Sequence, residues 1–281
     1  MTLHHANMRV VRAMIVLGLT AFGAAPVWAQ GSSVELDQLL FGHLDQHKTK
    51  CDSKGCGPTS VVNSFVYLQK YYDATSHLPK TPQPGPSIVT DFTDGGLATL
   101  ANLLGALMGC DANCGTGTDK LYDGKKTYLE KPGRTGGWVP KTDWNDDVTW
   151  KWITDTLMDG VDVELLVNDG KLGHYITLTG YTWTDTNKNG KQDDGETTVG
   201  IIDPDDGRYS RQTLNVDDQG HMTLIGYDLD PGTPDTVPPV TITDGFAEKL
   251  VPSAVPEPGV WMLLAAGTLL IGWRHRAVSA R

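Results

Sequence analysis

The ends of this chain carry short apolar runs, and these runs decide how much of the sequence can fold as one globular domain. Arg9 and Arg12 precede an apolar run over residues 13–25, and residues 27–29 place small side chains at the −3 and −1 positions of a cleavage site. This order is typical of a secretory signal, so we expect residues 1–29 to be removed during export. The alternative is an uncleaved anchor, although the run is shorter than the roughly 20 apolar residues of a spanning helix.

A second apolar stretch, residues 259–273, lies in the C-terminal segment 255–281, between a Pro-Glu-Pro motif at 256–258 and the basic cluster 274–276. This layout resembles the PEP-CTERM sorting tail of Gram-negative bacteria that make exopolysaccharide. The resemblance implies that the tail holds the protein transiently in the inner membrane, basic end inward, until an exosortase cuts near Pro-Glu-Pro. We expect residence in the cell envelope or extracellular matrix, with membrane contact through this segment alone; a plain C-terminal anchor is the alternative.

The body between these ends is acidic. Residues 231–254 hold five prolines, which predicts an extended linker and leaves residues 30–230 as one compact domain. The formal net charge is −11, and residues 1–29 and 259–281 contain arginine but no acid, so the body alone is more acidic still. Such a charge disfavours binding to nucleic acid or to anionic lipid headgroups, and it suits an exported protein that holds cations.

The hydrophobic pattern of the body predicts helices first and strands second. Apolar residues recur at helical spacing over residues 58–72, 96–108 and 146–158, and a long polar excursion is expected over residues 110–143. Strands are expected over residues 161–167, 174–183, 197–203 and 222–227. Helices followed by an antiparallel sheet indicate an α+β fold.

A cysteine opens the first predicted helix, in the run Gly55-Cys56-Gly57-Pro58. A free thiol, with a pKa of about 8.5, is mostly protonated at neutral pH, but the unpaired N–H groups and dipole of a helix N-terminus favour the thiolate. The flanking glycines leave room for a substrate carbonyl, and the same N–H groups can face a developing oxyanion. Because a cysteine before a helix is often only buried or disulfide-bonded, Cys56 is at this point a candidate nucleophile.

Two predicted strands supply candidates for a base and for a group that orients it. His174 lies at the start of a predicted strand, in the segment Gly-His-Tyr-Ile-Thr-Leu-Thr-Gly-Tyr, and Asp203 ends a strand in Ile-Ile-Asp-Pro. Taken singly, each has an ordinary structural explanation, a satisfied core histidine and a turn-forming aspartate. A cysteine, a histidine and an aspartate on three neighbouring elements form the nucleophile, base and orienter of an acyl-transfer site.

Together the three motifs resemble those of the papain-like cysteine peptidases, and in particular the branch related to bacteriocin-processing, double-glycine leader peptidases. The match spans about residues 40–230. It implies a papain-like α+β fold, with N-terminal helices packed on an antiparallel β-sheet. It also implies a peptide or protein substrate, with Cys56 as nucleophile, His174 as general base and Asp203 as orienter.

One part of the family pattern is displaced. These peptidases place a glutamine a few residues before the cysteine to complete the oxyanion hole, whereas here Gln46 is the nearest one upstream of Cys56. It can reach the site only if residues 47–54 loop out. Without such a donor, the fold would serve as a catalytically inactive calcium-binding surface or matrix protein. Amidase or transferase chemistry on the same three residues is a further alternative.

Residues 185–196 fit the EF-hand loop formula at every constrained position, with glycine at position 6. The flanks read as strands, so the loop would close the hairpin that carries His174 and Asp203. We expect Ca²⁺ to order this hairpin and to fix the two residues against each other, which would make activity calcium-dependent; a metal-free turn is the alternative. The expected ligands are Asp185, Asn187, Asn189, the Lys191 carbonyl, Asp193 and Glu196.

The four cysteines of an exported chain favour disulfide formation. If Cys56 stays free, one bridge can form among the remaining three. We expect Cys51 to pair with Cys110 or Cys114, because that bridge would brace the segment before Cys56. A Cys110–Cys114 bridge and a four-thiol zinc site are the alternatives.

Overall fold

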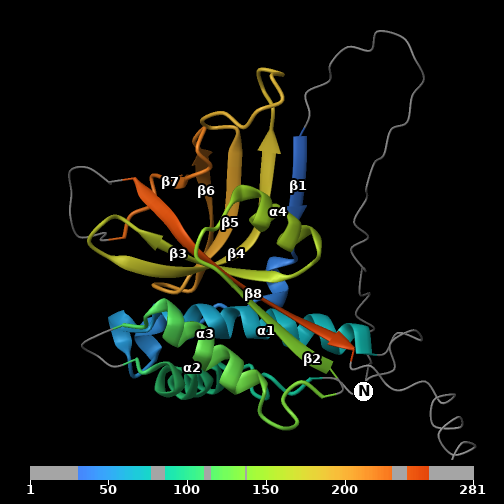
Figure 1. The fold of residues 1–281 in the computed structure, drawn as a ribbon. Coiled ribbons are helices and arrows are strands. Elements are labelled where there is room, and N and C mark those ends of the chain that lie inside the picture. Colours follow the sequence, from blue (N-terminus) through green and yellow to red (C-terminus); the bar gives the residue numbers. More distant parts are fainter. Residues whose placement is uncertain (1–30, 77–85, 111–114, 137, 230–238, 253–281) are drawn as a thin grey trace, which may run out of the picture.

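The computed structural model describes residues 31–76, 86–110, 115–136, 138–229 and 239–252. Helices pack on an antiparallel sheet, as predicted for the α+β class, with α1, α2 and α3 together on one side of it (Figure 1). The expected signal over residues 1–29 and the sorting segment over residues 255–281 lie outside the described residues. Within the described part of the chain, no helix has the length and apolar character needed to span a membrane.

Each helix begins or ends where local chemistry requires it. In α2 the Thr93 hydroxyl accepts the N–H of Gly96 at 3.2 Å, and Gly109 ends the helix in the left-handed region with a φ of 67°. In α1 residues 56–69 are buried on all sides, which makes it the central helix. The α-helices are α1 (Cys56–Ser76), α2 (Asp94–Met108), α3 (Thr118–Leu129) and α4 (Trp150–Met158); the short 3-10 turns are η1 (Gln38–Leu40), η2 (Gln46–Lys48) and η3 (Asp52–Lys54).

The strands pair antiparallel in the order β1-β4-β3-β8-β7-β6-β5, while β2 pairs with β8 and β4 also pairs with β5. The circuit from β3 round to β4 is therefore closed, like a small barrel, and Leu165, Ile176 and Ile201 belong to its apolar core. A second apolar core, including Phe65, Leu104 and Phe246, lies between sheet and helices. The strands are β1 (Gly31–Glu35), β2 (Trp138–Asn145), β3 (Asp162–Asn168), β4 (Gly173–Thr184), β5 (Thr197–Asp203), β6 (Arg208–Val216), β7 (Met222–Ile225) and β8 (Val240–Pro252).

The prediction of a linker over residues 231–254 is wrong for its second half, because residues 240–252 form β8 in the middle of the sheet. Within this strand Ile242, Phe246 and Leu250 are buried. The prolines bracket this segment and do not interrupt it, since none lies between residues 240 and 251. A proline count over the whole window therefore concealed an alternating strand pattern.

The predicted polar excursion over residues 110–143 is also wrong, because it contains α3 and most of β2. The composition of α3 is polar, but Leu121, Lys125 and Tyr128 follow one another at helical spacing and are all buried. The third predicted helix starts late as well. Thr149 caps α4 by accepting the N–H of Trp152 at 3.3 Å, so the helix begins at Trp150 instead of 146.

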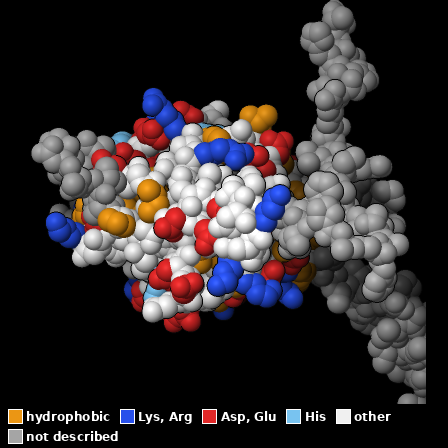
Figure 2. Space-filling model, turned by 90° about the horizontal axis from the view of Figure 1, so that it is seen from above, with side chains coloured by type: hydrophobic (Ala, Val, Ile, Leu, Met, Phe, Trp, Pro, Cys, Tyr) orange, Lys and Arg blue, Asp and Glu red, His pale blue; other side chains and the backbone are white. Residues whose placement is uncertain are grey.

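The surface carries both signs of charge. On the face seen in Figure 2, acidic and basic side chains are interspersed, and hydrophobic side chains occur only in small groups among the described residues. Strands β1 and β6 have no counterpart among the predicted strands. Few of the positions in these two strands are fully buried. Their sequences therefore show only a weak alternation of apolar and polar residues.

Candidate active site

The candidate nucleophile, Cys56, is the first residue of α1 and is 8% exposed. The helix begins with the N–H of Thr59 donating to the carbonyl of Gly55 at 3.0 Å. The N–H of Gly57 hydrogen-bonds the Cys56 thiol, as expected at a helix N-terminus. A Cβ atom at Gly57 would lie 3.1 Å from Leu121 Cδ1, so a larger residue there would press α1 against α3.

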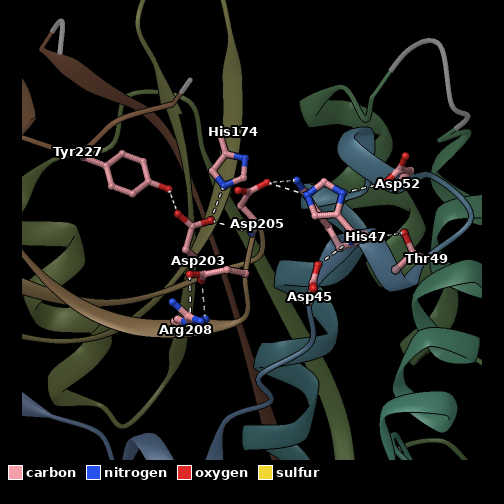
Figure 3. A network of polar contacts seen from close by, with 11 residues as sticks. Asp45, His47, Thr49, Asp52, His174, Asp203, Asp205, Arg208 and Tyr227 are labelled. Carbon is pink, nitrogen blue, oxygen red and sulfur yellow. Dashed lines mark hydrogen bonds and ion pairs between the residues drawn. The ribbon is translucent and has the colours of Figure 1, made fainter. Parts of the chain in front are cut away.

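His174 and Asp203 meet where β4 begins and β5 ends. The Nε2 atom of His174 lies 2.8 Å from Asp203 Oδ1 (Figure 3). The other carboxylate oxygen, Oδ2, accepts the hydroxyl of Tyr227 at 2.6 Å, and the backbone N–H of Asp205 donates to Oδ1 at 2.9 Å. Asp203 therefore has three hydrogen-bonding partners, and its bond to Nε2 is positioned to fix the orientation of the imidazole ring.

The thiol of Cys56 lies near the His174 ring in the same cleft, and the two groups interact. Since Asp203 occupies Nε2, Nδ1 is the ring nitrogen left for the sulfur. Three segments far apart in the sequence thus converge in the order cysteine, histidine, aspartate. The sequence prediction that Cys56, His174 and Asp203 come together agrees with this geometry.

The three groups shift one another's pKa values. Burial would by itself raise the pKa of the Cys56 thiol, but the hydrogen bond and charge of His174, with the N–H groups of Tyr175 and Gly57, outweigh burial and lower it. Burial would lower the pKa of His174, yet Asp203 and the Cys56 sulfur raise it to about 10. For Asp203, burial is likewise outweighed by the hydrogen bond and charge of His174, and its pKa is lowered. The arrangement favours a thiolate beside an imidazolium.

These groups line a cleft of about 710 Å³. Its lining comes from the start of α1 and the segment before α3, and from the β3–β4 turn and the segment after β7. The walls present both apolar and charged side chains to whatever enters. Besides the three groups above, the lining residues are Gln46, Ser53, Lys54, Gly115, Thr116, Gly117, Thr118, Leu166, Lys171, Leu172, Gly173, Tyr175, Asp205, Tyr227, Asp228 and Leu229.

The displaced glutamine reaches this cleft. The residues between Gln46 and Cys56 are taken up by the two 3-10 turns η2 and η3, and Gln46 lines the same cleft as Cys56 although it is otherwise buried. Its Nε2 donates to Asp205 Oδ1 at 2.8 Å. Residues 47–54 fold as short turns that leave Gln46 at the cleft, while the role of Gln46 as an oxyanion donor stays a prediction.

The predicted calcium loop, residues 185–196, joins β4 to β5. Asp185 is almost fully buried, and its two oxygens accept the N–H groups of Asn189 and Gly190 at 3.1 and 2.8 Å. Gly190 has a φ of 72°, which allows the sharp turn that the loop formula requires. Glu196 closes the loop and accepts the hydroxyl of Thr186.

The remaining expected calcium ligands gather on the same loop. The side-chain amides of Asn187 and Asn189 both donate to Asp193 Oδ2, and the N–H of Lys191 donates to Asn189 Oδ1 at 2.7 Å. The loop follows Thr184, whereas His174 lies near the other end of β4. About ten residues of strand, or ~33 Å along the chain, separate the loop from the candidate active site.

The three described cysteines are all unbridged thiols. Cys110 Sγ donates to the carbonyl of Lys54 at 3.3 Å, and it is also hydrogen-bonded to Cys51. Burial and the neighbouring Cys51 raise the pKa of Cys110 to about 12. The expected bridge between Cys51 and Cys110 is therefore not formed in this structure, although the two residues interact, and Cys114 lies outside the described residues.

Three polar residues around the site have no counterpart among the predicted site residues. Tyr227 bonds Asp203, Asp205 bonds Gln46, and His47 bridges Asp205 to Asp52 (Figure 3). The only local signal for them is proximity in sequence to Asp203 and Gln46. Their partners are set by how loops fold back on one another, which spacing within one segment does not encode.

The candidate site therefore rests on the geometry of the chain itself. No protein-family model matches the sequence, and no curated protein matches it either.

Proposed function

We propose that this protein is an exported cysteine peptidase of papain-like fold that hydrolyses peptide bonds through Cys56, His174 and Asp203. One observation carries the proposal: Cys56, His174 and Asp203 line the same cleft, and His174, which interacts with the Cys56 thiol, has its Nε2 atom 2.8 Å from Asp203 Oδ1. The position of the thiol at a helix N-terminus, with base and orienter on neighbouring strands, supports a papain-like arrangement.

The chemistry follows from these positions. The Cys56 thiolate attacks the carbonyl carbon, a C–S bond forms, and negative charge moves to the carbonyl oxygen, where N–H groups at the start of α1 face it. The imidazolium of His174 gives its proton to the leaving amine nitrogen as the C–N bond breaks. Water then attacks the thioester with His174 as base, which releases the carboxylic acid and restores the thiolate. Asp203 keeps the imidazole in one orientation throughout.

Alkylation of Cys56 tests the proposal without a known substrate. Iodoacetamide labelling, mapped by mass spectrometry over a pH series, is expected to modify Cys56 with a midpoint below the ~8.5 of an ordinary thiol. Cys110 serves as an internal control, because its pKa is raised to about 12. His174→Ala is expected to move the Cys56 midpoint upward, whereas His221→Ala, a histidine in an exposed pair with Asp217, leaves it unchanged.

Hydrolysis is expected to follow the same titrations. The lowered pKa of Cys56 places the acid limb of kcat/KM below the ordinary thiol value, and the raised pKa of His174 places the basic limb at about 10. The active ion pair therefore forms as pH rises through the first value and is lost as pH rises through the second. If Cys56 were alkylated only at alkaline pH, and at the same rate in the native protein and in His174→Ala, the result would favour the catalytically inactive surface protein instead.

The proposal of an exported location rests on the sequence of both ends. The negative charge of the body is also of the kind that suits an exported protein. We propose that an exosortase-type enzyme acts on the segment 255–281 after residues 1–29 have been removed.

We also propose that the loop 185–196 binds Ca²⁺. Asp185 and Glu196 offer carboxylates at its two ends, and the Thr186 hydroxyl with nearby N–H groups lowers the pKa of Glu196 to about 2, so it stays ionised. Oxygen atoms of Asn187 and Asp193 complete a hard, flexible ligand set of the kind that calcium prefers. The ion would stabilise the outer end of the β4–β5 hairpin, and any effect on His174 would pass along the strands.

Chelation is accordingly expected to change stability more than chemistry. Adding EDTA should lower the Tm by several degrees, since a ligand at about 100 times its Kd stabilises by ~2.7 kcal/mol. Asp185→Asn should lower the Tm similarly and remove the response to calcium. Asp194→Asn, in the same loop but outside the ligand positions, should keep that response. An unchanged Tm on chelation of the native protein would contradict the site.

A further inference from the structure

The loop after Asp203 is joined to Gln46 by two separate hydrogen bonds. The backbone N–H of Gln46 donates to the carbonyl of Pro204 at 2.7 Å, and its side-chain Nε2 donates to Asp205 Oδ1 at 2.8 Å. Both Gln46 and Asp205 line the cleft that contains Cys56. One short segment therefore carries the group that orients His174 and the group that holds the glutamine.

The bond to Asp205 decides how the Gln46 amide is turned. A carboxylate only accepts hydrogen bonds, so the NH₂ side of the amide must face Asp205. Gln46 Oε1 has no hydrogen-bond partner among the described residues, so no second bond fixes the rotation. The NH₂ group has two N–H donors, and the bond to Asp205 uses one of them. The second is left for a group in the cleft.

The same oxygen of Asp205 is also contacted by His47. His47 Nε2 lies 3.2 Å from Asp205 Oδ1, and His47 Nδ1 lies 2.7 Å from Asp52 Oδ1 (Figure 3). An imidazole can donate to two carboxylates at once only when it is protonated. The hydrogen bond to Asp52, followed by that to Asp205, raises the pKa of His47 despite its partial burial. The carboxylate oxygen that holds Gln46 therefore also has the His47 ring as a partner.

We propose that Asp205 is a positioning residue, which holds the Gln46 amide so that its second N–H donates to the substrate carbonyl oxygen at Cys56. This inference rests on the proposed function and explains how a glutamine displaced along the sequence still serves the oxyanion hole. The donor strengthens its bond as negative charge develops on that oxygen, so its loss lowers kcat and leaves KM nearly unchanged.

The experiment compares Asp205→Ala, Asp205→Asn, Gln46→Ala and the double variant Gln46→Ala/Asp205→Ala in the full chain, using a fluorogenic protein substrate such as labelled casein. Asp205→Ala is expected to lower kcat about 10- to 100-fold, and Gln46→Ala by about 100-fold, as for one oxyanion donor. The double variant is expected to be no slower than Gln46→Ala. Asp205→Asn keeps an oxygen acceptor for Nε2 and should recover most of the rate. Asp206→Ala, the next carboxylate in the loop, is the matched control and should keep the native rate.

Alkylation separates this inference from the proposed function. Iodoacetamide displaces iodide at carbon without forming an oxyanion, so its reaction with Cys56 should proceed at the native rate in every Asp205 and Gln46 variant. If native Cys56 is inert, the proposed function fails whatever Asp205 does. If Cys56 is reactive, three results overturn the role of Asp205: an unchanged kcat in Asp205→Ala, a loss confined to KM, or a double variant much slower than Gln46→Ala. Slowed alkylation in Asp205→Ala also overturns it, because Asp205 would then act through His174.

Discussion

Replacing Cys56 with alanine is expected to reduce peptide hydrolysis by at least about 10⁴-fold, because the substitution removes the atom that forms the acyl-enzyme bond. His174→Ala should cost nearly as much, since the thiol of Cys56 then loses the partner that lowers its pKa and supplies the leaving-group proton. The double variant should be no slower than either single one, because the two side chains act as one unit. Initial rates on labelled casein measure all three.

Cys110→Ala is the matched control for these variants. Cys110 lies close to the same loop, with its sulfur 3.3 Å from the Lys54 carbonyl, but it does not face the cleft as Cys56 does. Its loss should leave the rate within a few-fold of native. If Cys56→Ala retained native turnover while Cys110→Ala lost it, the nucleophile would be misassigned.

The candidate site was predictable from sequence to the extent that its chemistry is local. Cys56 lies beside glycines at a helix start, and His174 and Asp203 lie at strand ends, so each carries a signal within a few residues. The pairing of β4 with β5, which brings His174 to Asp203, needs only the assumption that consecutive strands lie side by side, and the structure agrees with it. The approach of α1 to β4 joins segments far apart in the sequence, and only the resemblance to a known family implied it.

What the sequence did not reveal depends on contacts between distant segments. The β8 strand was hidden because prolines on both sides dominate the local composition, although Phe246 and Leu250 are buried within it. Helix α3 was hidden because a lysine, Lys125, takes a core position. A buried lysine looks like a surface residue until its partners are known, and those partners, Glu164 and Glu248, lie on β3 and β8.

These charges form the polar centre of the layer between α3 and the sheet. Lys125, Glu164 and Glu248 are essentially inaccessible to solvent, and so is Asp162 beside them. The Lys125 Nζ lies 2.5 Å from Glu164 Oε2 and also contacts Glu248. Burial raises the pKa of Asp162 well above its usual range, and burial together with Glu164 raises the pKa of Glu248 to about 8. The buried carboxyl groups are therefore compatible with folding because the Lys125 ammonium neutralises part of their charge and because some of them stay protonated.

Lys125→Met is expected to lower the free energy of unfolding by about 3–5 kcal/mol, because it leaves buried carboxylates without their cation. Lys126→Met is the matched control: Lys126 is the next residue on α3 but is exposed, and its replacement should change stability by less than ~0.5 kcal/mol. Urea unfolding measures both. Adding Glu164→Gln and Glu248→Gln to Lys125→Met should recover part of the loss, and equal stability of the two lysine variants would contradict the assignment.

The same cluster sets the direction of a pH effect. A carboxyl whose folded pKa is raised contributes stability below its unfolded pKa, near ~4.3, and loses that contribution as pH rises through the folded value. For Glu248 this window extends to about 8, so stability at this centre declines from mildly acid to mildly alkaline pH, and Glu248→Gln should flatten the decline. We expect the cluster to influence the candidate active site as well, because Leu121, one turn before Lys125 on α3, lies against Gly57 beside the nucleophile. Loosening α3 in Lys125→Met should therefore also slow alkylation of Cys56 at temperatures where the chain is still folded.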